Sequence, residues 1–224
     1  MENFNYRREI PLWLLLIAPI IYIIIAWSSL PERVPIHFDI NGHANNWGSK
    51  EAIFLMPGAG VFTYLLLLFL PQIDPKKMSV EFFNSNFYKI RVAVTIFLSV
   101  ISILITYITL THDTGGLAVR FIPISGLLLI SVIGNFLINV KPNWFIGVRT
   151  PWTLSSDHVW KQTHLVLGRI WFYGGFAGII LALIVGIKWL AVVMLAFAII
   201  STVVAVVYSY LLYRNEQKNN GVES

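Results

Sequence analysis

The sequence contains no cysteine and little charge, and both absences narrow the class of protein. Without cysteine there is no disulfide framework, no thiol nucleophile and no zinc site built on cysteine ligands. Charged residues make up 12% of the 224 residues, about half the share in soluble domains, while hydrophobic residues reach 57%. Eleven acidic residues and 16 Lys plus Arg cannot cover a water-soluble surface of this size. The composition therefore indicates an integral membrane protein.

Long hydrophobic runs are the main feature that the sequence does have. A helix that crosses a hydrocarbon core of roughly 30 Å needs about 20 mostly apolar residues. Six runs qualify, at residues 10–30, 53–70, 92–110, 121–140, 170–187 and 189–212. They are continuously apolar rather than alternating, which favours helices over a closed barrel. We predict an all-α integral membrane protein, with residues 1–224 forming a single bundle of six transmembrane helices.

The basic residues predict how this bundle is oriented. With a cytoplasmic N-terminus, 12 of the 16 Lys and Arg residues fall in cytoplasmic segments and four in outer segments. We therefore expect both termini in the cytoplasm and the loop of residues 31–52 outside. The net charge of +5 is explained by this bias, so we expect no direct nucleic-acid partner. The polar tail from Arg214 onward is predicted to be disordered.

Inside the predicted spans, the polar residues are neutral and lie at helical spacing. None of the six runs contains Asp, Glu, Lys or Arg, so we expect the bundle to bury no charged side chain, which argues against an ion-coupled transporter. Five hydroxyls share one face of the third run: Thr95, Ser99, Ser102, Thr106 and Thr109. They either line a substrate path or bond to backbone carbonyls and neighbouring helices, and we favour the second interpretation.

Two further rows predict helix contacts in the second half of the chain. One row in the fourth run consists of Ser131, Asn135 and Asn139, and we expect it to face protein because an unpaired Asn in lipid is costly. The other row, in the fifth run, consists of the small residues Gly174, Gly178, Ala182 and Gly186. Small residues at this spacing allow a neighbouring helix to approach closely.

The outer loop of residues 31–52 is predicted to be ordered. Asn41 and Gly42 form a turn signal. His37, Asp39 and His43 give an H-x-D-x₃-H pattern of residue types that bind zinc and other divalent ions. Because this spacing is unspecific, we predict no metal and no cofactor. His37, Asp39, Gly42 and His43 remain candidates for binding a ligand on the outer side.

The loop of residues 141–169 is expected in the cytoplasm. Pro142 and Pro151 restrict its backbone, and Gly147 permits a turn. We predict a short amphipathic helix between spans four and five, with Ser155 as its N-cap. This helix either lies in the membrane interface or forms a docking platform, with the Arg149 guanidinium presented to a partner. Physical chemistry alone leaves both interpretations open.

The same loop resembles a known family. Residues 143–154 read NWFIGVRTPWTL and residues 159–161 read VWK, which is similar to the signature of the SdpI family of bacterial immunity proteins. Residues 30–31 (LP) and 34–38 (VPIHF), with Gly42 and Lys50, resemble the N-terminal domain of unknown function of many relatives. We accordingly divide the chain into a two-span unit over residues 1–72 and an SdpI-like unit over residues 120–213.

The resemblance implies a function in the bacterial plasma membrane. A member of this family is expected to be a non-enzymatic immunity protein that protects its cell from a secreted, membrane-active peptide toxin. It is also expected to act as a receptor that draws a cytoplasmic transcriptional repressor to the membrane. The partner-binding candidates that the resemblance implies are Asn143, Gly147, Arg149, Thr150, Pro151, Trp152, Thr153, Leu154 and Trp160.

Two alternatives from other functional classes stay open. A metal-dependent membrane enzyme would use the His37, Asp39 and His43 pattern, although the sequence contains no HExxH motif and no paired aspartates within the spans. A small peptide transporter would need a polar path, for which the hydroxyl row of the third span is the only candidate.

Overall fold

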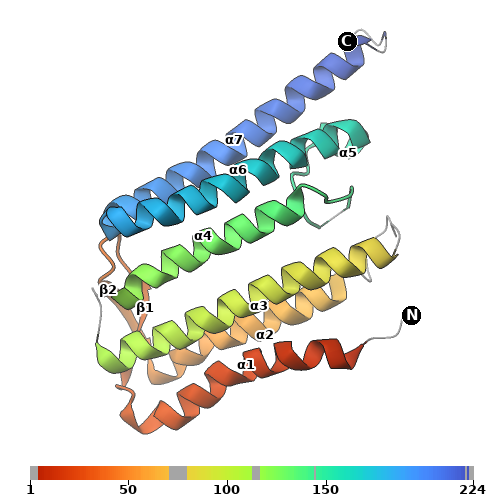
Figure 1. Cartoon of the computed structure of the whole chain (residues 1–224). Coiled ribbons are helices and arrows are strands. Elements are labelled where there is room, and N and C mark those ends of the chain that lie inside the picture. The colour runs from red at the N-terminus through yellow and green to blue at the C-terminus, as the bar shows by residue number, and fades with distance from the viewer. Residues whose placement is uncertain (1–4, 71–79, 113–116, 144, 220, 222–224) are drawn as a thin grey trace.

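The computed structural model describes residues 5–70, 80–112, 117–143, 145–219 and 221. Its long helices lie side by side and run between two ends of the molecule (Figure 1). Both ends of the described chain lie at the right in Figure 1, which we call the termini end, and the two strands lie at the opposite, hairpin end. Lys76 and Lys77, two of the predicted cytoplasmic cations, lie outside the described residues.

Within the described ranges, six helices are long and apolar enough to cross a membrane, which confirms the predicted number of spans. The long helices are α1 (Tyr6–Ala26), α2 (Leu55–Phe69), α3 (Val80–Thr111), α4 (Leu117–Leu137), α6 (Asp157–Ile184) and α7 (Ile187–Asn219). The 3₁₀ turns η1 (Trp27–Ser29) and η2 (Lys50–Phe54) extend α1 and α2, and α5 (Pro151–Ser155) is a single short turn. Large aliphatic side chains such as Ile25 and Ile184 are 75% and 78% exposed. Such exposure suits contact with lipid, so the chain is a multi-pass membrane protein.

The long helices pack in two groups of three. In the first group, α1 and α2 both pack chiefly against α3. In the second group, α4 packs along α6, and α6 packs along α7. The groups meet where α3 contacts α4, as the neighbouring positions of these helices in Figure 1 show. The α3–α4 contact is thus the seam of the molecule.

Small residues bring the backbones of α4 and α6 together. A Cβ atom added to Gly168 would lie 2.6 Å from the Gly134 carbonyl oxygen, and one added to Gly175 would lie 2.1 Å from Ser131 Oγ. The predicted small-residue row is therefore only partly right. Gly178 contacts α4 through Leu127 and Gly174 contacts α7 through Phe197, as the prediction of close helix neighbours requires. Gly186 would meet no described atom within 4 Å.

The outer loop folds into a β-hairpin that the sequence analysis did not predict. Strands β1 (Arg33–Phe38) and β2 (Ala44–Ser49) pair antiparallel. Val34, on β1, is fully buried in a cluster with Ile23, Leu30 and Ile53. These contacts seat the hairpin on the ends of the first two spans.

Two further predictions are wrong: where the helix after Pro151 begins and ends, and that the tail from Arg214 is disordered. The short amphipathic helix expected after Pro151 is not separate, because α6 begins at Asp157 and continues without a break to Ile184. Its N-cap is Ser156 rather than Ser155, and the Ser156 hydroxyl accepts the Val159 N–H at 3.2 Å. The tail from Arg214 is helical as far as Asn219, where α7 ends.

The predicted protein-facing row on α4 is also wrong at two of its three positions. Ser131 is fully buried, but Asn135 and Asn139 are exposed. Asn135 lies within one turn of the end of α4 at Leu137, and Asn139 lies beyond that end. At that depth water and headgroups are within reach, so neither amide needs a protein partner.

Candidate functional site

The loop after α4 is shaped by the buried side chain of Asn143, which is 1% exposed. Its Oδ1 accepts the N–H groups of Phe145 and Ile146 at 2.8 and 2.6 Å. Its Nδ2 donates to the carbonyls of Lys141 and Ile146 at 2.9 and 3.0 Å. One amide side chain thus satisfies four backbone groups that no helix or strand would pair.

Gly147 allows the loop to close on α6. Its φ of +115° is a conformation that favours glycine, and a Cβ there would lie 2.1 Å from His164 Nε2. His164 is buried, and its Nε2 accepts the Val148 N–H at 2.9 Å. Because Nε2 accepts, the ring must be neutral with its proton on Nδ1, which donates to the Trp160 carbonyl at 2.8 Å. The loop therefore locks onto α6 through one neutral imidazole.

Thr150 and Thr153 start the short helix α5. The Thr153 N–H donates to Thr150 Oγ1 at 3.2 Å, and the Thr150 N–H donates to Thr153 Oγ1 at 2.9 Å. This is a reciprocal capping box, with Pro151 in the first turn of the helix, where its missing N–H has no cost. The buried Thr153 hydroxyl also lies 2.8 Å from the Val148 carbonyl, to which it donates.

Tryptophans tie the loop to the neighbouring helices. Trp152 Nε1–H donates to Ser209 Oγ of α7 at 2.5 Å, and its ring lies edge-on to Tyr210. Trp160 is fully buried, donates from Nε1 to the Val140 carbonyl at 2.9 Å and stacks on His164. A movement of α6 relative to α7 would therefore be transmitted to the loop.

The predicted partner-binding residues thus divide into two kinds. Most of them build the loop, and Leu154 is half-buried within it. Arg149 differs, since it is the charged member of the set and it is exposed. We call residues 141–156 with His164 the signature loop. His164 could not be found from the sequence because a single histidine at a core position carries no motif, and Ser209 could not because it lies 57 residues from Trp152.

On the hairpin end, Asp39 and Gly42 make the turn between the strands. Asp39 Oδ1 accepts the N–H groups of Asn41 and His43 at 2.8 and 2.9 Å, and Gly42 has a φ of +84°. The hydrogen bond from the His43 backbone is the main reason why the pKa of the Asp39 carboxyl lies below its usual value. The carboxylate is thus engaged in holding the turn.

The hairpin geometry gives the metal hypothesis no support. His37 Nδ1 lies 2.5 Å from Asn45 Oδ1, and the Asp39 carboxylate accepts backbone N–H groups. Among the residues that the structure describes, no three His, Asp or Glu side chains come together to hold a metal ion. His37, Asp39, Gly42 and His43 remain a prediction for contact with an outer ligand.

The termini end contains a buried ion pair that the sequence analysis excluded. Glu9 of α1 and Arg91 of α3 are 5% and 6% exposed and form a salt bridge. The Tyr64 hydroxyl of α2 donates to Glu9 Oε2 at 3.0 Å, and Trp13 Nε1–H donates to the Tyr64 oxygen at 2.8 Å. We call Glu9, Trp13, Tyr64 and Arg91 the charge cluster. The expectation that this bundle buries no charged side chain is wrong, because both charges lie one residue outside the predicted runs.

Three of the five hydroxyls in the row on α3 have the structural role that we favoured, while the buried Ser99 hydroxyl has no hydrogen-bond partner among the described residues. All five side chains are at most 4% exposed. The hydroxyls of Ser102, Thr106 and Thr109 donate to carbonyls one turn earlier in the same helix, at 2.7 to 2.9 Å. Hydroxyls bonded in this way fill the space between helices and are not available to a passing substrate.

Comparisons with known proteins identify two segments of the chain. Residues 139–209 match the family model described as the SdpI/YfhL protein family, and residues 14–61 match a domain of unknown function, DUF1648. An uncharacterized protein of Archaeoglobus fulgidus is 27% identical over 78 residues, which cover 32% of this chain. The chain spans only 43% of the length of that curated relative. No solved structure matches.

Proposed function

We propose that the chain, whose residues 139–209 match the model of the SdpI/YfhL protein family, is an immunity protein of a bacterial plasma membrane. It protects the cell from a secreted, membrane-active peptide, and it does so by binding rather than by catalysis. The observation that carries the proposal is the family match over the signature loop, whose scaffold leaves Arg149 exposed.

The fold gives this proposal two separate surfaces. The hairpin end, with its ordered turn at Asp39, meets the peptide on the outer side of the membrane. The termini end carries the signature loop, where Arg149 offers a planar guanidinium to a carboxylate or carbonyl of a cytoplasmic repressor. The distribution of Lys and Arg residues favours a cytoplasmic termini end and an outer hairpin end.

The signature loop is linked to the hairpin end through the second helix group, which meets the first group, on which the hairpin sits, at the α3–α4 contact. Trp152 bonds to α7 and His164 bonds the loop to α6, so the loop follows any change in the packing of these helices. Signalling requires an equilibrium between two packing arrangements of these helices. The peptide shifts that equilibrium only if it binds the two arrangements with different affinity, and a tenfold difference in affinity corresponds to about 1.4 kcal/mol. Equal binding to both arrangements would give protection without signalling.

Protection is tested by survival. A toxin-sensitive bacterium that expresses the chain is challenged with a purified SdpC-type killing peptide, beside cells that carry the empty vector. We expect survival well above that of the vector control at equal membrane expression. Equal killing of the two strains over a series of such peptides would refute the immunity proposal.

The orientation of the chain in the membrane is tested by labelling introduced cysteines, which is direct because the sequence contains no cysteine of its own. Single cysteines are introduced at the exposed positions Asn41, in the hairpin turn, and Ser155, in the signature loop. A membrane-impermeant maleimide should label Asn41→Cys in intact cells and Ser155→Cys only after permeabilisation. The reverse pattern would place the signature loop outside and contradict the docking of a cytoplasmic partner.

Peptide export is the second candidate function, and the charge cluster is the observation that favours it. Ionisable groups buried among membrane helices commonly belong to ion pathways. Export predicts that vesicles lose a loaded peptide in response to a proton gradient and that Glu9→Gln abolishes this loss. Sequestration by an immunity protein predicts retention of the peptide in both proteins.

A further inference from the structure

A groove runs along the seam between the two helix groups. Its volume is about 530 Å³, within the range of small-ligand sites. Its walls are aliphatic and aromatic side chains of α3 and α4, among them Val92, Ile96, Val100, Leu128, Val132 and Phe136. Several of these side chains are exposed, so the groove lies on the surface that faces lipid.

The groove has a polar end and an apolar remainder. At the termini end it is lined by Tyr88 and Lys89. Ser125, near the other end, donates its hydroxyl to the Ile122 carbonyl at 2.7 Å and needs no further partner. Lys89 is the single charged side chain among the described residues that line the groove. An apolar groove of this kind does not hold water, so its occupant must be apolar along most of its length.

The dimensions decide between an acyl chain and a peptide helix. From Tyr88 to Val100 the groove follows α3 for about 18 Å at 1.5 Å per residue, close to the roughly 15 Å of one leaflet. A peptide helix that spans the hydrocarbon core would need a groove of about 30 Å. The groove suits a single hydrocarbon chain.

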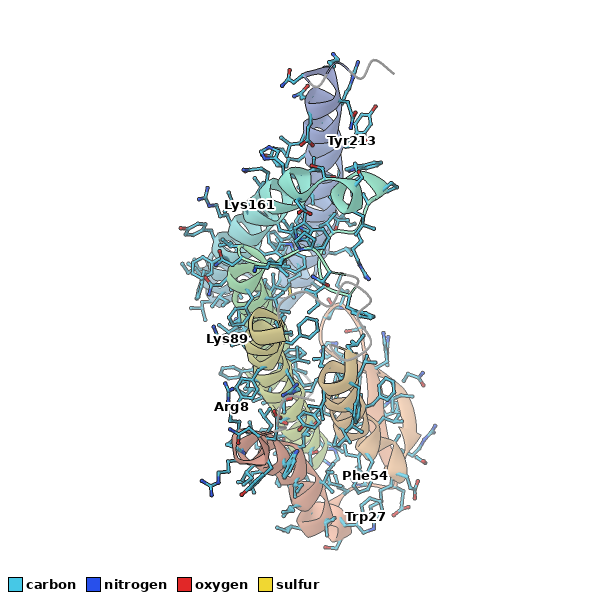
Figure 2. The ribbon with its side chains drawn as sticks, turned by 90° about the vertical axis from the view of Figure 1, so that its right-hand side faces the viewer. Arg8, Trp27, Phe54, Lys89, Lys161 and Tyr213 are labelled. Atoms are coloured by element: carbon cyan, nitrogen blue, oxygen red, sulfur yellow. The ribbon has the colours of Figure 1, made fainter. Side chains whose placement is uncertain are left out.

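The charge at the polar end favours an anionic headgroup. Lys89 is exposed, and the Arg8 guanidinium lies 4.6 Å from the centre of the Tyr88 ring. Arg8 and Lys89 lie on the same flank of the termini end (Figure 2). The nearby carboxylate of Glu9 is neutralised by Arg91 inside the bundle. Lys89 in the groove lining and Arg8 beside Tyr88 therefore place positive charge at the polar end of the groove, where it would attract a lipid phosphate.

We propose that the α3–α4 groove binds an anionic phospholipid, with one acyl chain along the seam and its phosphate at Lys89. The lipid fills a gap between the two helix groups that protein side chains leave open. It is thereby a structural ligand of the seam, and this role goes beyond the proposed immunity function.

The headgroup preference is tested by native mass spectrometry. The protein is released from nanodiscs that contain equal amounts of phosphatidylglycerol and phosphatidylcholine, and the retained lipid is identified. We expect phosphatidylglycerol to be retained several-fold over phosphatidylcholine, and Lys89→Gln to reduce this ratio at least threefold. The matched control is Lys161→Gln, an exposed lysine on the same flank that does not line the groove. Equal ratios in the wild type and Lys89→Gln would overturn the proposal.

A second variant tests the acyl chain itself. Ala93 lines the groove, so Ala93→Phe should fill it and reduce retention of both lipids by several-fold. Val203→Phe, at a 54% exposed position on α7, is the size-matched control and should retain lipid as the wild type does. Undiminished retention in Ala93→Phe would overturn the site. Capture of a hydrophobic helical peptide in place of any lipid would overturn the choice of ligand.

Discussion

The two helix groups are held together by different means. In the first group, α1, α2 and α3 meet at the charge cluster, where an ion pair and two hydrogen bonds join side chains that are distant in sequence. In the second group, α4 and α6 meet backbone to backbone at glycines, with no charged side chain among the close contacts described. One group depends on charge that must stay paired, and the other depends on space that must stay empty of side chains.

The two helix groups therefore tolerate different kinds of substitution. A buried ion pair is costly to break but can be replaced by an uncharged pair of similar size. A close backbone contact admits no added atom, because interiors are packed to crystal-like density. The signature loop is attached to the second group. The close packing of those helices holds the loop in place and so fixes the position of Arg149.

The largest expected effect comes from unpairing the charge cluster. Arg91→Met leaves the Glu9 carboxylate buried without its counter-ion, at a cost of about 3–5 kcal/mol. The thermal midpoint of the purified protein in detergent measures this loss. The double variant Glu9→Gln with Arg91→Met should recover most of it. A double variant as unstable as Arg91→Met alone would show that the charges do not act as a pair.

A single methyl group should disrupt the second group. In Gly168→Ala the new Cβ would lie 2.6 Å from the Gly134 carbonyl oxygen, which forces α4 and α6 apart at a cost of about 1–3 kcal/mol. Gly58→Ala is the matched control in α2, where no described atom lies within 4 Å of the new Cβ. That control should be neutral or gain up to about 1 kcal/mol from helix propensity. Equal thermal midpoints for both variants would refute the backbone contact.

Gly147→Ala should loosen the signature loop while the helices stay assembled. The substitution combines a positive φ with a Cβ 2.1 Å from His164 Nε2, and we expect a local cost of about 1–3 kcal/mol. Limited proteolysis should then cut within residues 145–156, with helix content unchanged. Adding His164→Ala should restore part of the protection from protease by removing the clash. Resistance equal to that of the wild type would contradict the observed closure.

The smallest expected effect is at the hairpin. The pKa of Asp39 is lowered, so its carboxylate stabilises the turn above the ordinary value of about 3.9 and loses that effect as the pH falls through the lower, folded pKa. The protection of the His43 amide against hydrogen exchange, relative to an unstructured amide at the same pH, should therefore be high near neutral pH and fall in strong acid. Asp39→Asn should remove this acid-dependent step. An acid-dependent step that persists in the variant would assign it to another group.

The spans could be predicted from sequence because lipid imposes length and apolarity on every helix, and the family resemblance is confirmed by the match over residues 139–209. The charge cluster could not be predicted, since Glu9 and Arg91 border apolar runs and only the packing of α1 on α3 shows that they meet. The hairpin was missed because residues 44–49 read ANNWGS, a sequence with little strand propensity. The individual roles in the signature loop depend on contacts with Ser209 and His164 that local sequence does not reveal.

We expect protection to depend on the surface that the signature loop presents at the termini end. The most direct measurement is survival of peptide-challenged cells that express Arg149→Ala, beside Arg214→Ala as the matched exposed arginine on α7. We expect Arg149→Ala to insert normally and to lose protection by at least tenfold, while Arg214→Ala protects as the wild type does. Full protection by a well-expressed Arg149→Ala protein would contradict the account.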